Sequence, residues 1–331
     1  MQMMELQGRT VLTQGRVLMK ENKLYLSHSN TKVTFAIRGE QVQFDCLTNH
    51  GLFADYACLN IYVDGAYVKS VAFGSKTKVI TISELSSDGL HEIALEKISE
   101  ATTNWIAVES IKVENGEWVS MALPANHVNK VLFLGDSITC GYGLYDGSME
   151  DGSKSYAYLA MQQLGWDAEY ICASGFGVYQ DYAGDTGRTI PKVYPYLSYF
   201  VDKTIPYDKT QFVPDYIVVY LGTNDSYHLH IEALRQAFLE HYEQFLLQLH
   251  EDYPSARVLL LAGTMTESIN SMLQDLVTSL QIKLPLSYLQ FDLQNERQDG
   301  VVKNDHPSEF THRKMAAKLV EQLLQIEGEY K

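Results

Sequence analysis

The chain has 331 residues, of which 46% are hydrophobic and 20% charged, a composition typical of a globular protein long enough for two domains. Lys and Arg number 26 against 41 Asp and Glu, a formal net charge of −15. A nucleic-acid backbone or an anionic membrane would repel such a chain. We therefore expect neither nucleic acid nor a membrane as a partner.

The four cysteines, at positions 46, 58, 140 and 172, are widely spaced and include no C-x-x-C pair. This spacing argues against a zinc ribbon, a thioredoxin-like redox site or a disulfide scaffold, so we expect buried thiols. The first residues, MQMMELQGRTVLTQ, lack a basic start followed by an apolar segment, and no stretch approaches 18 apolar residues. From this we expect a cytoplasmic protein.

Between about residues 10 and 120, apolar and polar residues alternate, as in KVTFAIRG and EQVQFDC. Alternation predicts half-buried antiparallel strands, whose inward-facing residues here would be Val33, Phe35, Ile37, Val42, Phe44 and Cys46. Asp64-Gly65 separates two such runs and predicts a tight hairpin, because this turn needs positive φ angles. The sequence therefore predicts an antiparallel β-sandwich over residues 1–125.

After residue 125 the pattern changes to short, continuous apolar runs: KVLFLG, EYICAS, DYIVVYLG, ARVLLLAG and LSYLQFD. Strands that are apolar on both faces are typical of a parallel sheet covered by helices on each side. Two segments show apolar stripes at helical spacing, one with Ile231, Leu234, Phe238, Phe245 and Leu249, the other with Met315, Leu319, Leu323 and Ile326. Residues 126–331 are thus predicted to form an α/β domain.

The stretch GDSITCGYG places Ser137 immediately after the first of these strands. Open parallel sheets build their ligand crevices at the carboxyl ends of the strands. A serine at such a turn can direct both its Oγ and its N–H at one reacting carbonyl, and Gly135, Gly141 and Gly143 allow the backbone to turn sharply. By itself, the same stretch could be only the N-cap of a helix.

Three further strand ends carry groups that acyl transfer needs: Gly175 in ASGFGV, Asn224 in YLGTNDS and His306 in NDHPSEFTH. Together the four blocks resemble the SGNH hydrolases, also called the GDSL esterase and lipase superfamily, which implies a three-layer α/β/α domain. The resemblance implies that Ser137 is the nucleophile and His306 the general base. It also implies an oxyanion hole made of the N–H groups of Ser137 and Gly175 and the side-chain amide of Asn224.

The third member of the catalytic triad departs from this family. Most members carry an Asp three residues before the histidine, where this chain has Lys303, and a subgroup carries it two residues before, where the chain has Asn304. Asn304 could orient the imidazole through its side-chain oxygen, and Asp305 or a backbone carbonyl are alternatives. We expect a Ser-His dyad that Asn304→Ala harms less than His306→Ala does.

A finer resemblance, over nearly the whole chain, is to carbohydrate esterase family 2, which joins a jelly-roll sandwich to an SGNH domain. The motifs GDSITCGYG, SGFGVY, GTNDS and HPSEFTHRKMA carry it, with IYVDG and DGLHEIALEKISE in the sandwich. It implies hydrolysis of acetyl esters on sugars or oligosaccharides through an acetyl-Ser137 intermediate, without metal or organic cofactor. Alternatives are a general acyl esterase, lipase or thioesterase, and a catalytically weak carbohydrate-binding protein.

Residues 178–216 form a long connection rich in tyrosine: Tyr179, Tyr182, Tyr194, Tyr196, Tyr199 and Tyr207. Aromatic faces with hydroxyl rims suit a sugar-binding wall, although the rings could equally pack an irregular insertion.

Other titratable residues receive structural roles. His228 and His230 form an H-x-H without nearby residues at metal-ligand spacing, so we expect surface or pocket-rim histidines. His312 is expected to be structural or a cap partner. Asp136 and Asp225 are expected to hold loops by hydrogen bonds rather than react.

Overall fold

The computed structural model describes residues 1–49, 57–86, 89–124, 128–147 and 149–328. The chain forms two compact units: Met1–His127 with Tyr196–Tyr207, and Val128–Pro195 with Asp208–Lys331. The segment Tyr196–Tyr207, which sequence reasoning placed in the second domain, thus belongs to the first unit.

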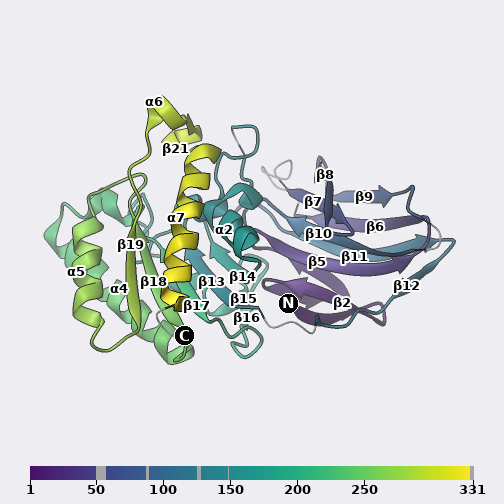
Figure 1. The fold of residues 1–331 in the computed structure, drawn as a ribbon, viewed down its shortest axis with the longest axis horizontal. Helices are drawn as coiled ribbons and strands as arrows, with labels where there is room; N and C mark the ends of the chain where they lie inside the picture. Colours follow the sequence, from purple (N-terminus) through teal and green to yellow (C-terminus); the bar gives the residue numbers. More distant parts are fainter. Residues whose placement is uncertain (50–56, 87–88, 125–127, 148, 329–331) are drawn as a thin grey trace. The chain divides into compact units, whose positions relative to one another are not determined.

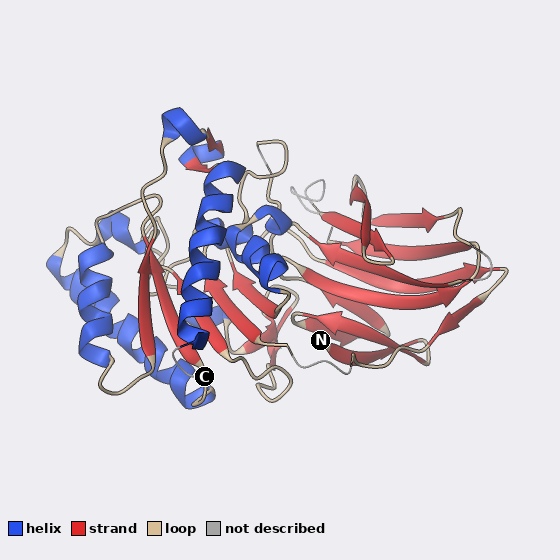
Figure 2. Ribbon diagram, in the orientation of Figure 1, coloured by secondary structure: helices blue, strands red, loops and turns tan. Residues whose placement is uncertain are grey.

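The first unit is an antiparallel β-sandwich (Figure 2). One sheet has the order β1-β2-β5-β10-β7-β8, with β12 paired to β5, and the other has the order β3-β4-β11-β6-β9. Their strands are β1 (Gln2–Leu6), β2 (Arg9–Gln14), β3 (Val17–Lys20), β4 (Lys23–Leu26), β5 (Thr31–Arg38), β6 (Gln41–Thr48), β7 (Cys58–Val63), β8 (Ala66–Ala72), β9 (Thr77–Ile82), β10 (Leu90–Lys97), β11 (Ile106–Glu114) and β12 (Glu117–Val119).

The core of the sandwich confirms the alternating pattern. All six residues predicted to face inward are buried, and Phe35 of one sheet packs on Phe44 of the other with 5.2 Å between ring centroids. Asp64 and Gly65 have φ angles of 52° and 79° and join β7 to β8, as the hairpin prediction requires. The prediction of an antiparallel sandwich is therefore confirmed.

A two-stranded hairpin, β15 (Tyr196–Ser198) and β16 (Asp202–Pro206), completes the first unit. Arg16 explains why this segment leaves the α/β unit: its Nη1 donates to the Tyr196 carbonyl at 2.7 Å, and its guanidinium lies 3.7 Å from the centroid of the Tyr207 ring. Further contacts are Ser198 with Ser27 at 2.8 Å and an ion pair between Lys20 and Asp202 at 2.9 Å. Contacts between side chains far apart in the sequence therefore place this hairpin in the first unit.

The second unit has a five-stranded parallel sheet of order β14-β13-β17-β18-β19 (Figure 1). Its strands are β13 (Lys130–Gly135), β14 (Asp167–Cys172), β17 (Tyr216–Tyr220), β18 (Arg257–Ala262) and β19 (Leu286–Gln290). The helices are α1 (Ser137–Cys140), α2 (Tyr156–Leu164), α3 (Ile190–Val193), α4 (Glu232–Asp252), α5 (Asn270–Leu280), α6 (Glu296–Asp299) and α7 (Glu309–Gly328), with short 3-10 turns η2 (Gly152–Lys154), η3 (Asp225–His228) and η4 (Lys303–Asp305). A short pair, β20 (Val301–Val302) and β21 (His306–Pro307), precedes α7.

Helices cover the sheet as the continuous apolar runs predict. Residues of α2 and α7 share one buried cluster with one face of the strands, and α5 packs on β18 and β19. The predicted stripe of α7 is buried throughout. In α4 the stripe is confirmed from Phe238 onward, but Ile231 is 46% exposed because it precedes the first helical turn.

The strand order fixes where a ligand crevice forms. Two segments that follow the carboxyl ends of adjacent strands, β13 and β17, carry Ser137 and Asn224. In a sheet of this order the connections leave these two strands in opposite directions, which opens a crevice between their carboxyl ends. The fold therefore brings the block with Ser137 and the block with Asn224 to the same edge of the sheet.

All four cysteines lie within the described residues, and all are buried and outside any disulfide, as expected. Within the described ranges, no helix is long and apolar enough to cross a membrane.

Candidate active site

Ser137 stands at a sharp turn from β13 into α1. Gly135 allows this turn, because a Cβ there would lie 2.0 Å from Thr139 Oγ1. Asp136 caps the helix by accepting from the Ile138 N–H at 3.0 Å, and Gly141 ends it with a φ of 73°. Ser137 is buried, with 7% of the residue exposed.

His306 lies beside the serine although 169 residues separate the two in the sequence. The distance between His306 Nε2 and Ser137 Oγ is 2.8 Å, within hydrogen-bond range. The histidine begins β21, where it pairs with Val302 of β20, so a small hairpin presents the imidazole to Ser137. A serine hydroxyl becomes a useful nucleophile when a neighbouring imidazole accepts its proton, and this geometry allows that transfer.

Main-chain carbonyls orient the imidazole. His306 Nδ1 lies 3.1 Å from the Lys303 oxygen and 3.0 Å from the Asn304 oxygen. Carbonyl oxygens only accept, so we assign the imidazole proton to Nδ1, which leaves Nε2 free to accept from Ser137. Of the three orienting groups considered from the sequence, the structure places backbone carbonyls at Nδ1. The side chain of Asn304 instead donates from Nδ2 to the Tyr142 hydroxyl at 3.1 Å.

Burial lowers the pKa of His306 below its ordinary 6.5. The Asn304 and Lys303 carbonyls and the Asp305 charge oppose this shift, but desolvation is the largest cause. The imidazole is therefore neutral near pH 7, the form that a general base requires.

Asn224 connects three of the four sequence blocks. Its Nδ2 donates to the Phe176 carbonyl at 2.9 Å and lies 3.4 Å from Asp136 Oδ2. Phe176 follows Gly175, and Asp136 precedes Ser137. The contact with Asp136 is longer than an ordinary hydrogen bond, so one amide hydrogen is only weakly held and can serve an oxyanion.

The loop that carries Gly175 is fixed by Asp225. This carboxylate accepts from three consecutive backbone N–H groups, those of Val178, Tyr179 and Gln180, at 2.9 to 3.0 Å. Gly177 permits the approach, because a Cβ there would lie 2.3 Å from Asp225 Oδ2. Gly175 itself has a φ of 81°, a conformation that favours glycine. Asp225 thus holds a loop by hydrogen bonds, as the sequence predicted.

Asp136 also confirms its predicted structural role as the cap of α1. Burial raises its pKa to about 7, and the nearby Asp225 charge adds to the increase, while the hydrogen bond from Ile138 opposes it. Asp136 and Asp225, which adjoin Ser137 and Asn224 in the sequence, are therefore both buried carboxyls.

His312 and His228 have partners other than the dyad. His312 is buried and accepts from the Tyr156 N–H at the start of α2 through Nδ1 at 2.9 Å, which confirms the cap role. Burial lowers its pKa to about 3. His228 is at the surface, where Nε2 lies 3.0 Å from the Tyr182 oxygen. In the part of the chain that the structure describes, no cluster of three or more His, Cys, Asp or Glu residues is arranged to hold a metal.

The six tyrosines divide between the two units. Tyr194 and Tyr207 are buried, and Tyr179 packs against His241 with 4.7 Å between ring centroids. Tyr196 and Tyr199 belong with Tyr207 to the hairpin of the first unit. Tyr182 differs from the other five, because it is 53% exposed and its ring lies 3.0 Å from the position of a Cβ on Gly175.

Sequence reasoning missed two residues that neighbour the predicted site. Tyr142 packs on His306 with 4.5 Å between ring centroids, and its position between two glycines of GDSITCGYG was the available signal. Arg188 lies over the Phe176 ring and pairs with the buried Asp181 at 3.2 Å. No motif singled out this arginine.

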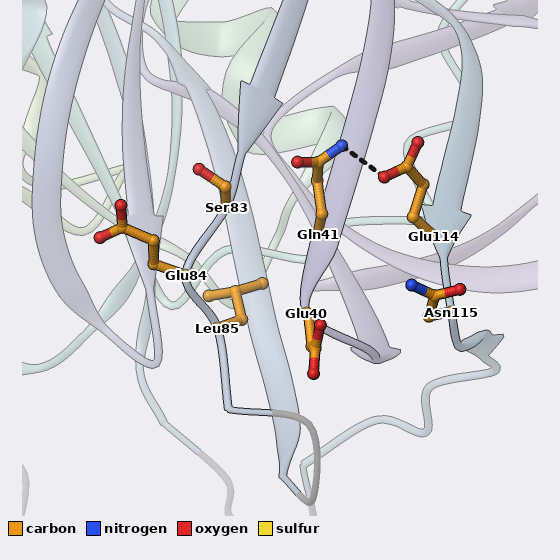
Figure 3. A pocket seen from close by; sticks show the side chains of 7 residues that line it. All are labelled: Glu40, Gln41, Ser83, Glu84, Leu85, Glu114 and Asn115. Atoms are coloured by element: carbon orange, nitrogen blue, oxygen red, sulfur yellow. Dashed lines mark hydrogen bonds between the residues drawn. The ribbon is translucent and has the colours of Figure 1, made fainter.

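A separate pocket of about 330 Å³ lies on the sandwich and is drawn in Figure 3. Its lining includes three carboxylates, Glu40, Glu84 and Glu114, and Glu114 accepts from Gln41 at 2.8 Å. None of the predicted site residues lines this pocket.

Two family models match this chain. Residues 131–319 match the family described as GDSL-like Lipase/Acylhydrolase, and residues 13–122 match the one described as Carbohydrate esterase 2 N-terminal. Among curated relatives, Cellulase/esterase CelE of Acetivibrio thermocellus is 27% identical over 79% of this chain, and this chain spans 33% of that protein. An acetylxylan esterase / glucomannan deacetylase of Cellvibrio japonicus is 22% identical over 81% of this chain and 76% of its own length.

Solved structures show the same fold. A family two carbohydrate esterase from Clostridium thermocellum, in complex with cellohexaose, superimposes with a TM-score of 0.86 and 24% identity, covering 96% of this chain and 99% of its own. The acetyl xylan esterase Est2A from the rumen bacterium Butyrivibrio proteoclasticus gives 0.85 and 18% identity, covering 99% and 100%. Both combine a sandwich and an α/β domain in one chain, as here.

Proposed function

Since the chain belongs to the GDSL-like lipase/acylhydrolase family, we propose that it is a serine esterase that removes short acyl groups, in particular O-acetyl groups from sugars or oligosaccharides. The observation that carries this proposal is the 2.8 Å contact between His306 Nε2 and Ser137 Oγ. The contact joins the Ser137 hydroxyl to an imidazole whose Nδ1 already donates to the Lys303 and Asn304 carbonyls.

The reaction proceeds in two displacements. Ser137 Oγ attacks the acyl carbon while its proton passes to His306 Nε2, and the C=O electron pair moves onto oxygen. Collapse of this intermediate breaks the bond to the alcohol oxygen, which takes the proton from His306 and leaves as a sugar hydroxyl. A water then loses its proton to His306 and attacks the acyl carbon of acyl-Ser137. Collapse breaks the bond to Ser137 Oγ, which takes the proton back from His306, and the carboxylic acid is released.

The oxyanion formed in each displacement would be stabilised by the N–H groups of Ser137 and Gly175 and by Asn224 Nδ2. These donors come from three segments, which Asp136, Asp225 and Asn224 itself fix by hydrogen bonds. Donors that are already in place cost no reorganisation during the reaction, and one such donor is typically worth about 100- to 1000-fold in kcat.

Two features support a carbohydrate ester. The relatives named above include an acetylxylan esterase / glucomannan deacetylase. The exposed ring of Tyr182 beside Gly175, with Arg188 Nη2 at 3.8 Å from the Cβ position of the same glycine, offers an aromatic face and hydrogen-bond donors. This combination suits a sugar ring next to the scissile ester.

The test compares initial rates on p-nitrophenyl acetate, p-nitrophenyl octanoate and a peracetylated xylose for the wild type and Ser137→Ala. We expect turnover of acetate and sugar ester that Ser137→Ala lowers by at least about 1000-fold, while Ser83→Ala, a serine substitution on the sandwich, has no effect. Preference for octanoate would indicate a lipase-like enzyme. Sugar binding without turnover of any ester would indicate a carbohydrate-binding protein and overturn the proposal.

The cytoplasmic location expected from the sequence stays a prediction. Cell fractionation with an antibody against the protein would test it.

A further inference from the structure

The loop that carries the nucleophile and the hairpin that carries the base meet at Tyr142. We propose that Tyr142 is a positioning residue, which holds the His306 imidazole and the turn whose carbonyls orient it. This inference rests on the proposed esterase function.

The backbones of the two segments lie unusually close beside this tyrosine. Gly143 has a φ of 77°, and a Cβ there would lie 2.6 Å from Val302 Cγ2 and 3.4 Å from the Lys303 nitrogen. Gly141, on the other side of Tyr142, has a φ of 73°. The two glycines therefore let the nucleophile loop turn and bring Tyr142 against the histidine hairpin.

Tyr142 contacts the base and its neighbour at once. The rings of Tyr142 and His306 are 4.5 Å apart at their centroids and inclined by 44°. The Tyr142 hydroxyl accepts from Asn304 Nδ2 at 3.1 Å, and Lys303 Nζ lies 5.8 Å from the Tyr142 ring centroid. Tyr142 thus contacts the imidazole. It also contacts both residues, Lys303 and Asn304, whose carbonyls accept hydrogen bonds from His306 Nδ1.

The turn behind the imidazole needs such support. Asn304 and Asp305 have φ angles of 54° and 55°, a left-handed conformation that non-glycine residues adopt at a cost in free energy. Asn and Asp tolerate it better than most residues. The turn directs the Lys303 and Asn304 carbonyls at Nδ1. Gln294, which donates to the Asp305 carbonyl at 2.7 Å, holds its far side.

The first experiment measures kcat, KM and Tm for two pairs of variants with p-nitrophenyl acetate. Tyr142→Phe keeps the ring and loses the hydroxyl, so we expect kcat to fall by about 2- to 12-fold, the effect of one hydrogen bond. Tyr142→Ala should lower kcat by about 100-fold, as expected for a misplaced catalytic group. KM should change little, because a positioning residue acts on the base rather than on substrate binding. Tyr67→Phe, which removes an exposed hydroxyl on β8, is the matched control and should match the wild type.

The second pair separates backbone conformation from the side-chain amide. Asn304→Gly loses the amide but keeps access to the left-handed turn, whereas Asn304→Ala loses both. We therefore expect Asn304→Gly to retain more kcat than Asn304→Ala, with Tm values for the two within a few degrees. Equal kcat for Tyr142→Ala and the wild type, or a higher kcat for Asn304→Ala than for Asn304→Gly, would overturn the proposal.

A measurement without turnover keeps this proposal distinct from the proposed function. Nitrogen-15 NMR of the His306 imidazole, assigned by its loss in His306→Gln, should show the proton on Nδ1 in the wild type and a mixture of both tautomers in Tyr142→Ala. An unchanged tautomer in Tyr142→Ala would refute the positioning role even if the protein hydrolyses esters. Absence of esterase activity in the wild type would refute the proposed function, and the tautomer shift would still test the role of Tyr142.

Discussion

At the scale of the residue, Asp136 links stability to pH. Burial raises its pKa from 3.8 to about 7 in the folded protein. The folded state therefore binds a proton more tightly than the unfolded state between about pH 4 and 7, so this carboxyl contributes stability below pH 4 that is lost as pH rises toward 7. Asp136→Asn, which can still cap α1, should reduce the loss. Urea unfolding midpoints at pH 5 and 8 check this, and equal losses in the two proteins would contradict it.

His306 sets the acidic limit of the proposed activity. A general base works in its neutral form, and burial lowers the pKa of this imidazole below 6.5. Activity should therefore persist into more acidic solution than an ordinary histidine would allow. We expect the acidic limb of kcat/KM for p-nitrophenyl acetate, measured from pH 4 to 8, to have its midpoint below 6.5. A midpoint above that value would mean that the carbonyls at Nδ1 outweigh desolvation.

At the scale of the element, the turn between β13 and α1 depends on the absence of a side chain at Gly135. A Cβ there would lie 2.0 Å from Thr139 Oγ1 and 2.6 Å from Thr139 Cβ, both on α1. Gly135→Ala should displace the helix that begins with Ser137, costing about 1 to 3 kcal/mol of unfolding free energy and at least about 10-fold in kcat. Gly74→Ala, where nothing lies within 4 Å of the added Cβ, is the control. Wild-type kcat in Gly135→Ala would show that the turn adapts.

At the scale of the whole molecule, the hairpin Tyr196–Tyr207 makes the chain cross between its two units more than once. Arg16 is 1% exposed and bonds both ends of this segment, through the Tyr196 carbonyl and the Tyr207 ring. Arg16→Ala should lower the unfolding free energy by about 2 kcal/mol or more, because a desolvated cation–π contact and a charged hydrogen bond are both lost.

Urea unfolding followed by tryptophan fluorescence measures the effect of Arg16→Ala. Limited proteolysis should at the same time reveal faster cleavage within residues 196–207. Arg38→Ala, whose side chain is 55% exposed beside Glu117, should leave both readouts near the wild type. Equal stability of the Arg16 and Arg38 variants would show that the hairpin is held by its other contacts.

The sequence by itself determined the architecture and the reacting groups. Alternation at Val33, Phe35 and Ile37 specified an inward face, because strand side chains point to opposite sides in turn. Continuous apolar runs specified a covered parallel sheet. The resemblance of four short blocks to the SGNH hydrolases pointed to Ser137 and His306, which the structure places 2.8 Å apart. These features depend on local periodicity and residue type, so a linear pattern is enough to show them.

Only the tertiary structure decided what orients the base and where the tyrosine-rich connection lies. The acceptors at His306 Nδ1 are backbone carbonyls, which every residue possesses, so no residue type marks them. Tyr182 is exposed beside Gly175 while Tyr207 is buried under Arg16, although both belong to the same tyrosine-rich stretch. Such outcomes depend on contacts between residues far apart in the chain, which form only when the whole fold brings them together.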